Sequence, residues 1–436
     1  MFLLVPVPVC LLLSTCLCWQ AEQEWSQWRG DQRDGVWQET EVVTEFDDAS
    51  LKTLWTQPIS SGYSGPTVAD GRVYLMDRRI TDDRQTERVL CFDANSGAPI
   101  WQHEYPADYA NVGYGAGPRA SVTIEDGMAY TLGTMAHAFC FDAATGKVIW
   151  QRDLDKEYGI SKSKRMPFWG ISGSPLIYDD VVILHIGGAD GACIVALDKS
   201  NGKEVWRALD DRAQYSSPII TQQNGKDIVV CWTGDSVAGL NPKTGETWWR
   251  FPFPPSRMPI GVATPLVQGN RLFFTSFYDG ALMLEMDTNE MKVTEVWRAV
   301  GPNEKSTQAL HSIISTPLWL GEHIYGVDSY GEFRCLKAAD GARVWDDLTA
   351  VPKSRWSTIH FVQNGELTWM FNERGELILR KLSPEGFEEL SRAKIIEPTT
   401  EQLRRRNGVC WSHPAFADRC IFVRNDKELK CISLAK

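Results

Sequence analysis

One motif constrains the fold of this chain more than any other feature: an Asp, a Gly and a Trp spaced four residues apart, repeated along the sequence. An Asp that bonds its own backbone, followed by a Gly with positive φ, makes a tight connection between two antiparallel strands. The Trp then lies on the outgoing strand. The intact copies are Asp93/Gly97/Trp101, Asp142/Gly146/Trp150 and Asp198/Gly202/Trp206, and partial copies are Gly245/Trp249, Gly341/Trp345 and, stretched by two residues, Asp287/Trp297.

The spacing of these copies predicts a β-propeller. Each unit has a Ser/Thr/Gly-Pro start, two strands rich in β-branched residues around a Gly turn, and the strands on either side of the repeated motif. We call these four strands A to D, from the centre outward. Each unit of four strands spans about 43 to 56 residues, which is the period expected of a propeller blade. The Trp of each copy is expected to dock its blade against the next one.

The two ends of the chain are expected to complete one blade together. Residues 51–59, LKTLWTQPI, form a D strand with no blade before it, whereas residues 411–436 contain three strands and no D strand. A degraded copy places Leu390 where a seventh Trp would stand. The prediction is an all-β, eight-bladed propeller over residues 51–436, closed by its N-terminal strand so that no sheet edge is left open.

The N-terminus favours export. Residues 1–18 are mostly apolar and uncharged, too short for a confident membrane span, and are interpreted as a signal peptide followed by an N-terminal segment over residues 19–50. A lipid anchor at Cys16 is a second interpretation. The expected location is the periplasm or cell envelope, or the outside of the cell, and the propeller is expected to be monomeric.

The net charge limits the classes of partner, and the cysteine positions limit the possible disulfides and metal sites. With 45 basic and 56 acidic residues the net charge is −11, which disfavours nucleic acid. Cys91, Cys140 and Cys335 share one position of the repeat and are expected to be small buried side chains. Cys410, Cys420 and Cys431 could include one disulfide, and their spacing suggests no metal site.

The motifs CFDAATGKVIW and ALDKSNGKEVW closely match the Ala-x-Asp-x-x-x-Gly-x-x-x-Trp docking signature, so the chain resembles the pyrroloquinoline-quinone-repeat propellers. The segment QWRGDQRDGVW, residues 27–37, looks like the N-terminal part of secreted members. The resemblance implies either a quinone-dependent alcohol or sugar dehydrogenase, or a non-catalytic binder similar to the outer-membrane assembly lipoproteins. The fold alone does not choose between them.

The sequence lacks residues that a quinone-dependent dehydrogenase is expected to have. The resemblance implies that such a dehydrogenase would hold pyrroloquinoline quinone with an adjacent-cysteine disulfide, a stacking Trp, calcium and an Asp base, and this sequence has no adjacent cysteines. No hydrolase elbow, zinc-protease or phosphate-loop motif is present either. We therefore expect no catalytic residue, metal or cofactor, with pyrroloquinoline quinone and calcium kept for the alternative.

The candidate binding face is formed by the D-to-A connections, because variable loops on a rigid frame commonly carry binding residues. Two of these connections are long, at residues 104–120 and 153–173. The candidates are Tyr109, Tyr114, Arg119, Arg165, Trp169, Tyr215, Arg257, His311, Arg355, Trp356, Trp411 and His413. The predicted function is an exported, non-catalytic propeller that recognises an envelope protein or peptide. The alternatives are a quinone-dependent oxidoreductase and a carbohydrate-binding or hydrolytic propeller.

Overall fold

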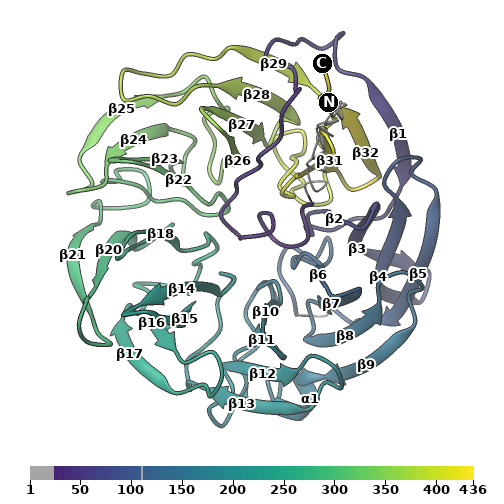
Figure 1. Cartoon of the computed structure of the whole chain (residues 1–436), viewed down its shortest axis with the longest axis vertical. Coiled ribbons are helices and arrows are strands. Elements are labelled where there is room, and N and C mark those ends of the chain that lie inside the picture. Colours follow the sequence, from purple (N-terminus) through teal and green to yellow (C-terminus); the bar gives the residue numbers. More distant parts are fainter. Residues whose placement is uncertain (1–23, 110) are drawn as a thin grey trace, which may run out of the picture.

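The computed structural model describes residues 24–109 and 111–436 and contains eight four-stranded antiparallel sheets arranged around a central axis (Figure 1). This arrangement confirms the eight-bladed all-β prediction. Apart from the strands, the described residues form one short helix, α1, over Leu154–Tyr158. The predicted signal peptide, residues 1–18, lies outside the described residues, and no helix within the described residues is long and apolar enough to span a bilayer.

The blades follow one another in chain order. Blade 1 consists of β2 (Thr67–Ala69), β3 (Arg72–Thr81), β4 (Arg84–Asp93) and β5 (Pro99–Pro106), and blade 2 of β6 (Thr123–Glu125), β7 (Met128–Leu132), β8 (His137–Asp142) and β9 (Val148–Asp153). Blade 3 consists of β10 (Leu176–Tyr178), β11 (Val181–His185), β12 (Ile194–Asp198) and β13 (Glu204–Ala208), and blade 4 of β14 (Ile219–Gln223), β15 (Lys226–Trp232), β16 (Ser236–Leu240) and β17 (Thr247–Pro252). Blade 5 consists of β18 (Leu266–Gln268), β19 (Arg271–Ser276), β20 (Gly280–Met286) and β21 (Val293–Ala299), and blade 6 of β22 (Leu318–Leu320), β23 (His323–Val327), β24 (Phe333–Lys337) and β25 (Arg343–Asp347). Blade 7 consists of β26 (Ile359–Asn364), β27 (Leu367–Asn372), β28 (Glu376–Arg380) and β29 (Ser391–Lys394), and blade 8 of β30 (Ala415–Ala417), β31 (Cys420–Arg424), β32 (Glu428–Ser433) and β1 (Thr53–Pro58).

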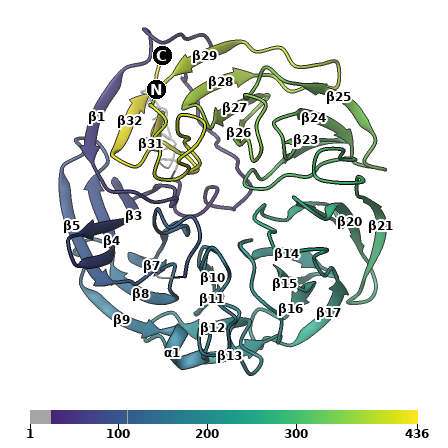
Figure 2. The same ribbon diagram turned by 180° about the vertical axis from the view of Figure 1, so that it is seen from behind.

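The ring closes as the sequence predicts. Strand β1 is the outermost strand of blade 8 and pairs antiparallel with β32, with Trp55 opposite Cys431. Figure 2 shows β1 beside β32, next to blade 1. The two ends of the chain therefore share one sheet.

The repeated motif joins neighbouring blades. The indole of Trp101 lies over Gly146 of the next blade, where a Cβ would come within 2.5 Å of the ring, and its Nε1–H donates to the Ala143 carbonyl at 2.9 Å. Asp142 accepts the Thr145 N–H at 2.8 Å and so fixes the turn that carries the glycine. The same indole-on-glycine contact is made by Trp55 on Gly97, Trp150 on Gly202, Trp206 on Gly245 and Trp297 on Gly341.

Three interfaces depart from this pattern, and the first joins blades 4 and 5. The turn of blade 5 has Met291 at the position where the other turns have glycine, so Trp249 has no glycine of this kind to cover. Its Nε1–H donates instead to the side-chain oxygen of Gln223, in its own blade, at 2.9 Å.

The second departure is at Trp345, which faces blade 7 from the outer strand of blade 6. Trp345 is only half-buried, and its indole does not cover the glycine of the next turn: a Cβ at Gly386 would meet no heavy atom within 4 Å. The indole still reaches blade 7, because its Nε1–H donates to the Ser383 carbonyl at 3.1 Å. The ring itself packs edge to face on Phe333 of its own blade, with centroids 5.3 Å apart. Trp345 therefore docks through a hydrogen bond and without the glycine contact.

The third departure is the expectation for Leu390, which is wrong. The outer strand of blade 7 starts one residue later, at Ser391, and Leu390 is 53% exposed. The connection between β28 and β29 is longer than in the intact copies of the motif, so it carries Gly386 away from Trp345 and leaves Leu390 facing solvent.

The N-terminal segment compensates at blade 7. Phe46 stacks on Trp369 with ring centroids 5.7 Å apart, and its N–H donates to the Ser391 hydroxyl at 3.0 Å. Trp37 and Phe416 complete this cluster between blades 7 and 8. Phe46 and Trp37, which lie outside the repeat, therefore pack between blades 7 and 8, where the outer strand supplies no Trp.

The same segment crosses the centre of the ring, as the purple trace of Figure 1 shows. Arg33 is buried and donates to main-chain carbonyls of Ser174, Pro175 and Pro218, which belong to the starts of blades 3 and 4. Further along, the Trp37 N–H donates to the Gln363 carbonyl at 2.7 Å in blade 7. Residues 24–50 therefore form a strap, and we use this name for them below.

The eight cysteines within the described residues are all buried and unpaired, including Cys410, Cys420 and Cys431. Cys91 and Cys140 lie directly opposite Trp101 and Trp150 in their sheets. Burial raises the pKa of both thiols to about 12, so they remain protonated and behave as small apolar side chains.

Candidate functional site

A pocket of about 110 Å³ lies at the centre of the ring. Most of its wall comes from the D-to-A connections, the loops expected to form the binding face. The lining residues are Trp28, Tyr63, Tyr114, Arg119, Trp169, Ser172, Tyr215, Val262, Ile313, Ile314, Trp356, His360, Trp411 and His413. Seven of the twelve sequence candidates, namely Tyr114, Arg119, Trp169, Tyr215, Trp356, Trp411 and His413, are brought together here.

One repeat position supplies half of this wall. In seven blades the residue four positions before the first residue of the A strand lines the pocket: Tyr63, Arg119, Ser172, Tyr215, Val262, Ile314 and Trp411. In blade 7 this position is Arg355, and the next residue, Trp356, faces the pocket instead. The symmetry of the ring places these equivalent side chains in one layer, while their chemical identities differ from blade to blade.

A cluster of aromatic rings forms the upper wall. Tyr114 and Trp356 meet edge to face with centroids 5.4 Å apart, and Trp169 stacks at a tilt on Tyr215 at 4.8 Å. Trp356 also contacts Trp169 and Trp411, at 6.1 and 6.5 Å. Such pairs are worth about 0.5–1.5 kcal/mol each beyond their buried area, so the rings support one another.

The floor is built by the strap and two histidines. Trp28 donates from Nε1 to the Thr264 hydroxyl at 2.8 Å and contacts the ring of His413 at 5.1 Å. His413 in turn lies 4.8 Å from His360. Burial lowers the pKa of His360 to about 4 and that of His413 further below its ordinary value, so both imidazoles are neutral at pH 7.

Arg119 provides the charge of the pocket. Its guanidinium donates to the carbonyls of Gly113, Tyr114 and Gly117 at 2.6 to 3.0 Å and lies 4.9 Å above the ring of Tyr63. No Asp or Glu is among the described residues that line the pocket. With both histidines neutral, the lining carries a positive charge that no carboxylate of the lining balances.

Two other candidates, Tyr109 and Arg165, stabilise the frame outside the pocket. Tyr109 is buried and donates to the carboxylate of Glu87. Arg165 spans to blade 3, where it pairs with Asp210 at 3.0 Å. These contacts bind loops to their own scaffold.

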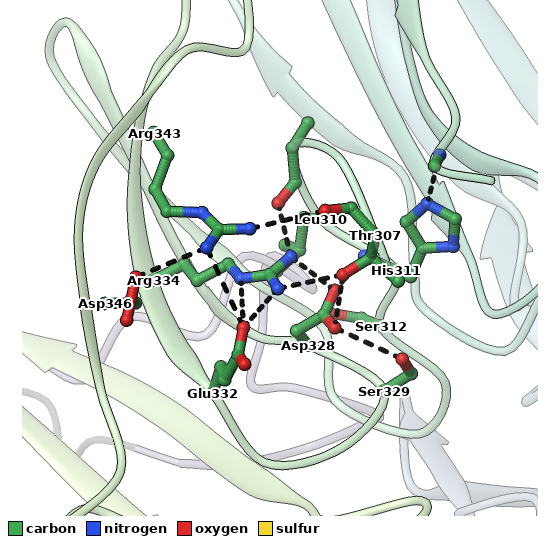
Figure 3. Close-up of polar contacts among 12 residues, drawn as sticks. Thr307, Leu310, His311, Ser312, Asp328, Ser329, Glu332, Arg334, Arg343 and Asp346 are labelled. Carbon is green, nitrogen blue, oxygen red and sulfur yellow. Dashed lines mark hydrogen bonds and ion pairs between the residues drawn. The ribbon is translucent and has the colours of Figure 1, made fainter. Parts of the chain in front are cut away.

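His311 is fully buried beside the ion pair between Asp328 and Arg334 (Figure 3). Its Nδ1 lies 3.0 Å from the Phe277 carbonyl. The main-chain N–H of His311 donates to Asp328 at 2.8 Å. This histidine therefore belongs to a structural network of blades 5 and 6, which separates it from the pocket.

Arg257 and Arg355 lie near the rim. Both approach Glu304, at 3.9 and 3.0 Å, and Arg355 also covers the ring of Trp356 with its guanidinium 4.5 Å from the centroid. Arg355 thus fixes the outer side of one pocket wall, whereas Arg257 is exposed and lies over the ring of Tyr278, 5.0 Å from its centroid.

Sequence reasoning missed half of the lining: Trp28, Tyr63, Ser172, Val262, Ile313, Ile314 and His360. A signal for four of them was available. Tyr63, Ser172, Val262 and Ile314 each precede the proline of the blade start by three residues, as do the recognised Tyr215 and Trp411. Aligning the blades on this proline would have identified them.

The repeated blades, their Trp-on-Gly contacts and the ring closure define this chain as a pyrroloquinoline-quinone-repeat β-propeller. The family model described as outer membrane protein assembly factor BamB matches residues 85–347, and the chain belongs to this family. It is 25% identical over 225 residues to the outer membrane protein assembly factor BamB of Shewanella oneidensis. That match covers 47% of this chain and only 54% of the relative, about half of its length.

Solved structures share the fold. BamB from Moraxella catarrhalis superimposes with a TM-score of 0.59 at 16% identity, covering 88% of this chain and 98% of that one. A europium-containing methanol dehydrogenase gives 0.64 at 11% identity over 95% and 99% of the two chains. The quinohemoprotein alcohol dehydrogenase from Comamonas testosteroni gives 0.61 at 12% identity over 94% and 80%. At these identities the likeness shows the fold alone.

The pocket does not fit pyrroloquinoline quinone with calcium. The quinone is a fused-ring molecule with several carboxylates, whereas the pocket encloses about 110 Å³ and its single cation already donates to three carbonyls. Calcium binds six to eight oxygen ligands, which usually include carboxylates, and the lining contains no carboxylate. Within residues 24–109 and 111–436 no group of three His, Cys, Asp or Glu side chains is placed to hold a metal.

Proposed function

We propose that this protein is an exported, non-catalytic propeller of the cell envelope that binds a protein or peptide partner on its D-to-A loop face. The observation that carries this proposal is the aromatic pocket at the centre of that face. Aromatic and Arg side chains around a small, desolvated depression are typical of the energetically dominant part of a protein interface. Membership of the BamB family supports a role in the envelope.

The surroundings of the pocket suit an interface. Phe168, next to the pocket residue Trp169, is 57% exposed, and its carbonyl accepts the Gly113 N–H at 2.8 Å, so it is held by the neighbouring loop. An exposed aromatic ring on an ordered loop loses little conformational entropy when a partner covers it. We therefore expect Phe168 to lie inside the contact area and the aromatic pocket to hold its centre.

Site-specific photocrosslinking in intact cells tests the proposal. A photoreactive phenylalanine analogue at position 168 should capture a defined envelope protein, and Trp356→Ala should weaken that capture at least tenfold. The matched control carries the analogue at Lys147, an exposed residue just after the repeated turn on the opposite face, and should capture nothing above background. Equal capture at both positions, or none at 168, would contradict a binding role for the loop face.

A titration separates this proposal from the oxidoreductase alternative. Pyrroloquinoline quinone, with and without calcium, should leave the tryptophan fluorescence of the purified protein unchanged after correction for absorbance. Saturable quenching at micromolar quinone would instead support the dehydrogenase.

A further inference from the structure

We infer that the pocket recognises a single aromatic ring carrying an oxygen hydrogen-bond acceptor, of the kind a tyrosine side chain offers, presented by the partner protein. This inference rests on the proposed function and adds to it the chemistry of the group that the pocket takes. Four independent features of the pocket support it: its shape, its unpaired donors, its backbone strain and its charge.

The shape and the walls suit one flat ring. A cavity of about 110 Å³ is of the order that accepts a benzene-sized group. Trp169, Tyr215, Trp356 and Trp411 present faces and edges in tilted and edge-to-face pairs, which is the arrangement that accommodates another aromatic ring. In the same layer as Tyr215 and Trp411, Val262 and Ile314 keep the sides of the pocket apolar.

Two indoles of the wall have donors with no acceptor. Nε1 of Trp169 and Nε1 of Trp356 are buried without a hydrogen-bond partner among the described residues. The other two pocket indoles are satisfied, Trp28 by Thr264 at 2.8 Å and Trp411 by Glu373 at 3.2 Å. A buried unpaired donor costs about 1–3 kcal/mol, and an oxygen brought in by a ligand would recover that cost. The rings of Trp169 and Trp356 must part slightly for this, because their N–H groups are shielded in the free protein.

The backbone of the wall is strained. Trp356 has φ of 71° and Tyr114 has φ of 53°, in the left-handed region that bulky residues rarely adopt. Local hydrogen bonds hold both: the Trp356 N–H donates to the Ser329 carbonyl at 2.8 Å, and the Tyr114 carbonyl accepts from Arg119 at 2.6 Å. Strain of this kind costs about 1–3 kcal/mol per residue and clusters at ligand-binding positions. Here it places two rings in contact above one cavity.

The positive charge of the pocket lining determines which polar group a ligand can carry. Arg119 makes the lining positive, and a positive lining repels ammonium groups, so this cluster differs from the aromatic cages that bind methylated lysine or choline. It favours an electron-rich ring and an accepting oxygen. A phenol satisfies both requirements, whereas a phenylalanine ring satisfies only the apolar walls.

The test uses p-cresol, toluene and tetramethylammonium as probes of the full-length mature protein with ¹⁵N-labelled tryptophan. We expect p-cresol to bind at least tenfold more tightly than toluene and to shift two indole N–H resonances, which Trp169→Phe and Trp356→Phe identify. Trp319→Phe, at an indole whose N–H is bound to Gly321, is the matched control and should leave p-cresol binding unchanged. Equal affinity for toluene without N–H shifts, a preference for tetramethylammonium, or no binding of p-cresol would each overturn the inference.

A blocked pentapeptide, Gly-Gly-Tyr-Gly-Gly, distinguishes a tyrosine on a protein from a free phenol. Binding of the peptide with the same two N–H shifts supports presentation by a partner. Binding of p-cresol alone overturns that part and assigns the pocket to a small phenolic ligand. Failure here is distinguishable from failure of the proposed function, because crosslinking at position 168 measures contact of a partner with the loop face whatever fills the pocket.

Discussion

Trp101 and Gly146 fit together so closely that a single methyl group has no room between them: a Cβ on the glycine would lie 2.5 Å from the indole. The two residues come from neighbouring blades, and the glycine has φ of 71°. The contact is therefore both a turn requirement and a packing requirement, and the two can be separated by experiment.

Gly146→Ala should destabilise the protein by about 1–3 kcal/mol more than Gly127→Ala, because overpacking adds to the strain of a left-handed alanine. Gly127 is the matched control, since its φ is 70° and a Cβ there would meet no heavy atom within 4 Å. Urea unfolding of both variants measures the difference. Equal losses would mean that the indole moves aside without cost.

Arg33→Ala should lower the free energy of unfolding by at least about 2 kcal/mol, because it leaves buried carbonyls of blades 3 and 4 without a donor. Arg33→Lys should recover little, since one ammonium does not reproduce the fork of a guanidinium. Limited proteolysis should then cleave the strap first. Arg84→Ala, at an exposed hairpin position, is the control, and resistance of the strap in the Arg33 variants would contradict its anchoring role.

The ion pair between Arg334 and Asp328 in Figure 3 has both side chains 3% exposed and a separation of 2.7 Å. Arg334→Met should cost about 3–5 kcal/mol because it leaves a buried carboxylate uncompensated, and adding Asp328→Asn should recover much of that loss. Arg343→Met, at a half-buried pair of the same blade, should cost less than about 1 kcal/mol. A double variant no more stable than Arg334→Met would refute the explanation.

Stability should fall as the pH drops from about 6.5 to about 4, in part because of His185. Burial lowers the pKa of this histidine to about 4, so the unfolded chain binds a proton in that window and the folded protein does not. The loss is at most about 1.4 kcal/mol per pH unit for one such group. His185→Gln should make the pH dependence of the unfolding free energy shallower by up to that amount, and identical slopes would contradict the assignment.

The blade count was predictable because each copy of the motif is local: Asp, Gly and Trp lie within nine residues and mark one turn and the outer strand that follows it. The missing glycine contact of Trp345 and the exposure of Leu390 have one cause, because one loop of altered length removes the glycine that Trp345 would cover and shifts the strand that follows Leu390. The spacing of the motif along the sequence does not reveal such a change in loop length. The Trp keeps its place in its own blade, while the turn glycine that it would cover moves in the next blade.

The pocket was only partly predictable. Its aromatic residues stood out by type, whereas Val262 and Ile314 look like ordinary strand residues until the blades are aligned on their prolines. The docking of Trp28 and Phe46 was not predictable, since their partners lie hundreds of residues away and follow no local pattern.

The pairing of the two ends of the chain also determines the order in which parts of the protein can fold. Strand β1 and the segment before it emerge first from the ribosome, but they pair with β32, Leu434 and Gln363, near the other end of the chain. Strand β1 must therefore remain unpaired until β32 has been made, whereas Trp25 of the strap can already pair with Val68 of blade 1. His413, on the floor of the pocket, is also made late, so the pocket is complete only once nearly the whole propeller has been synthesised.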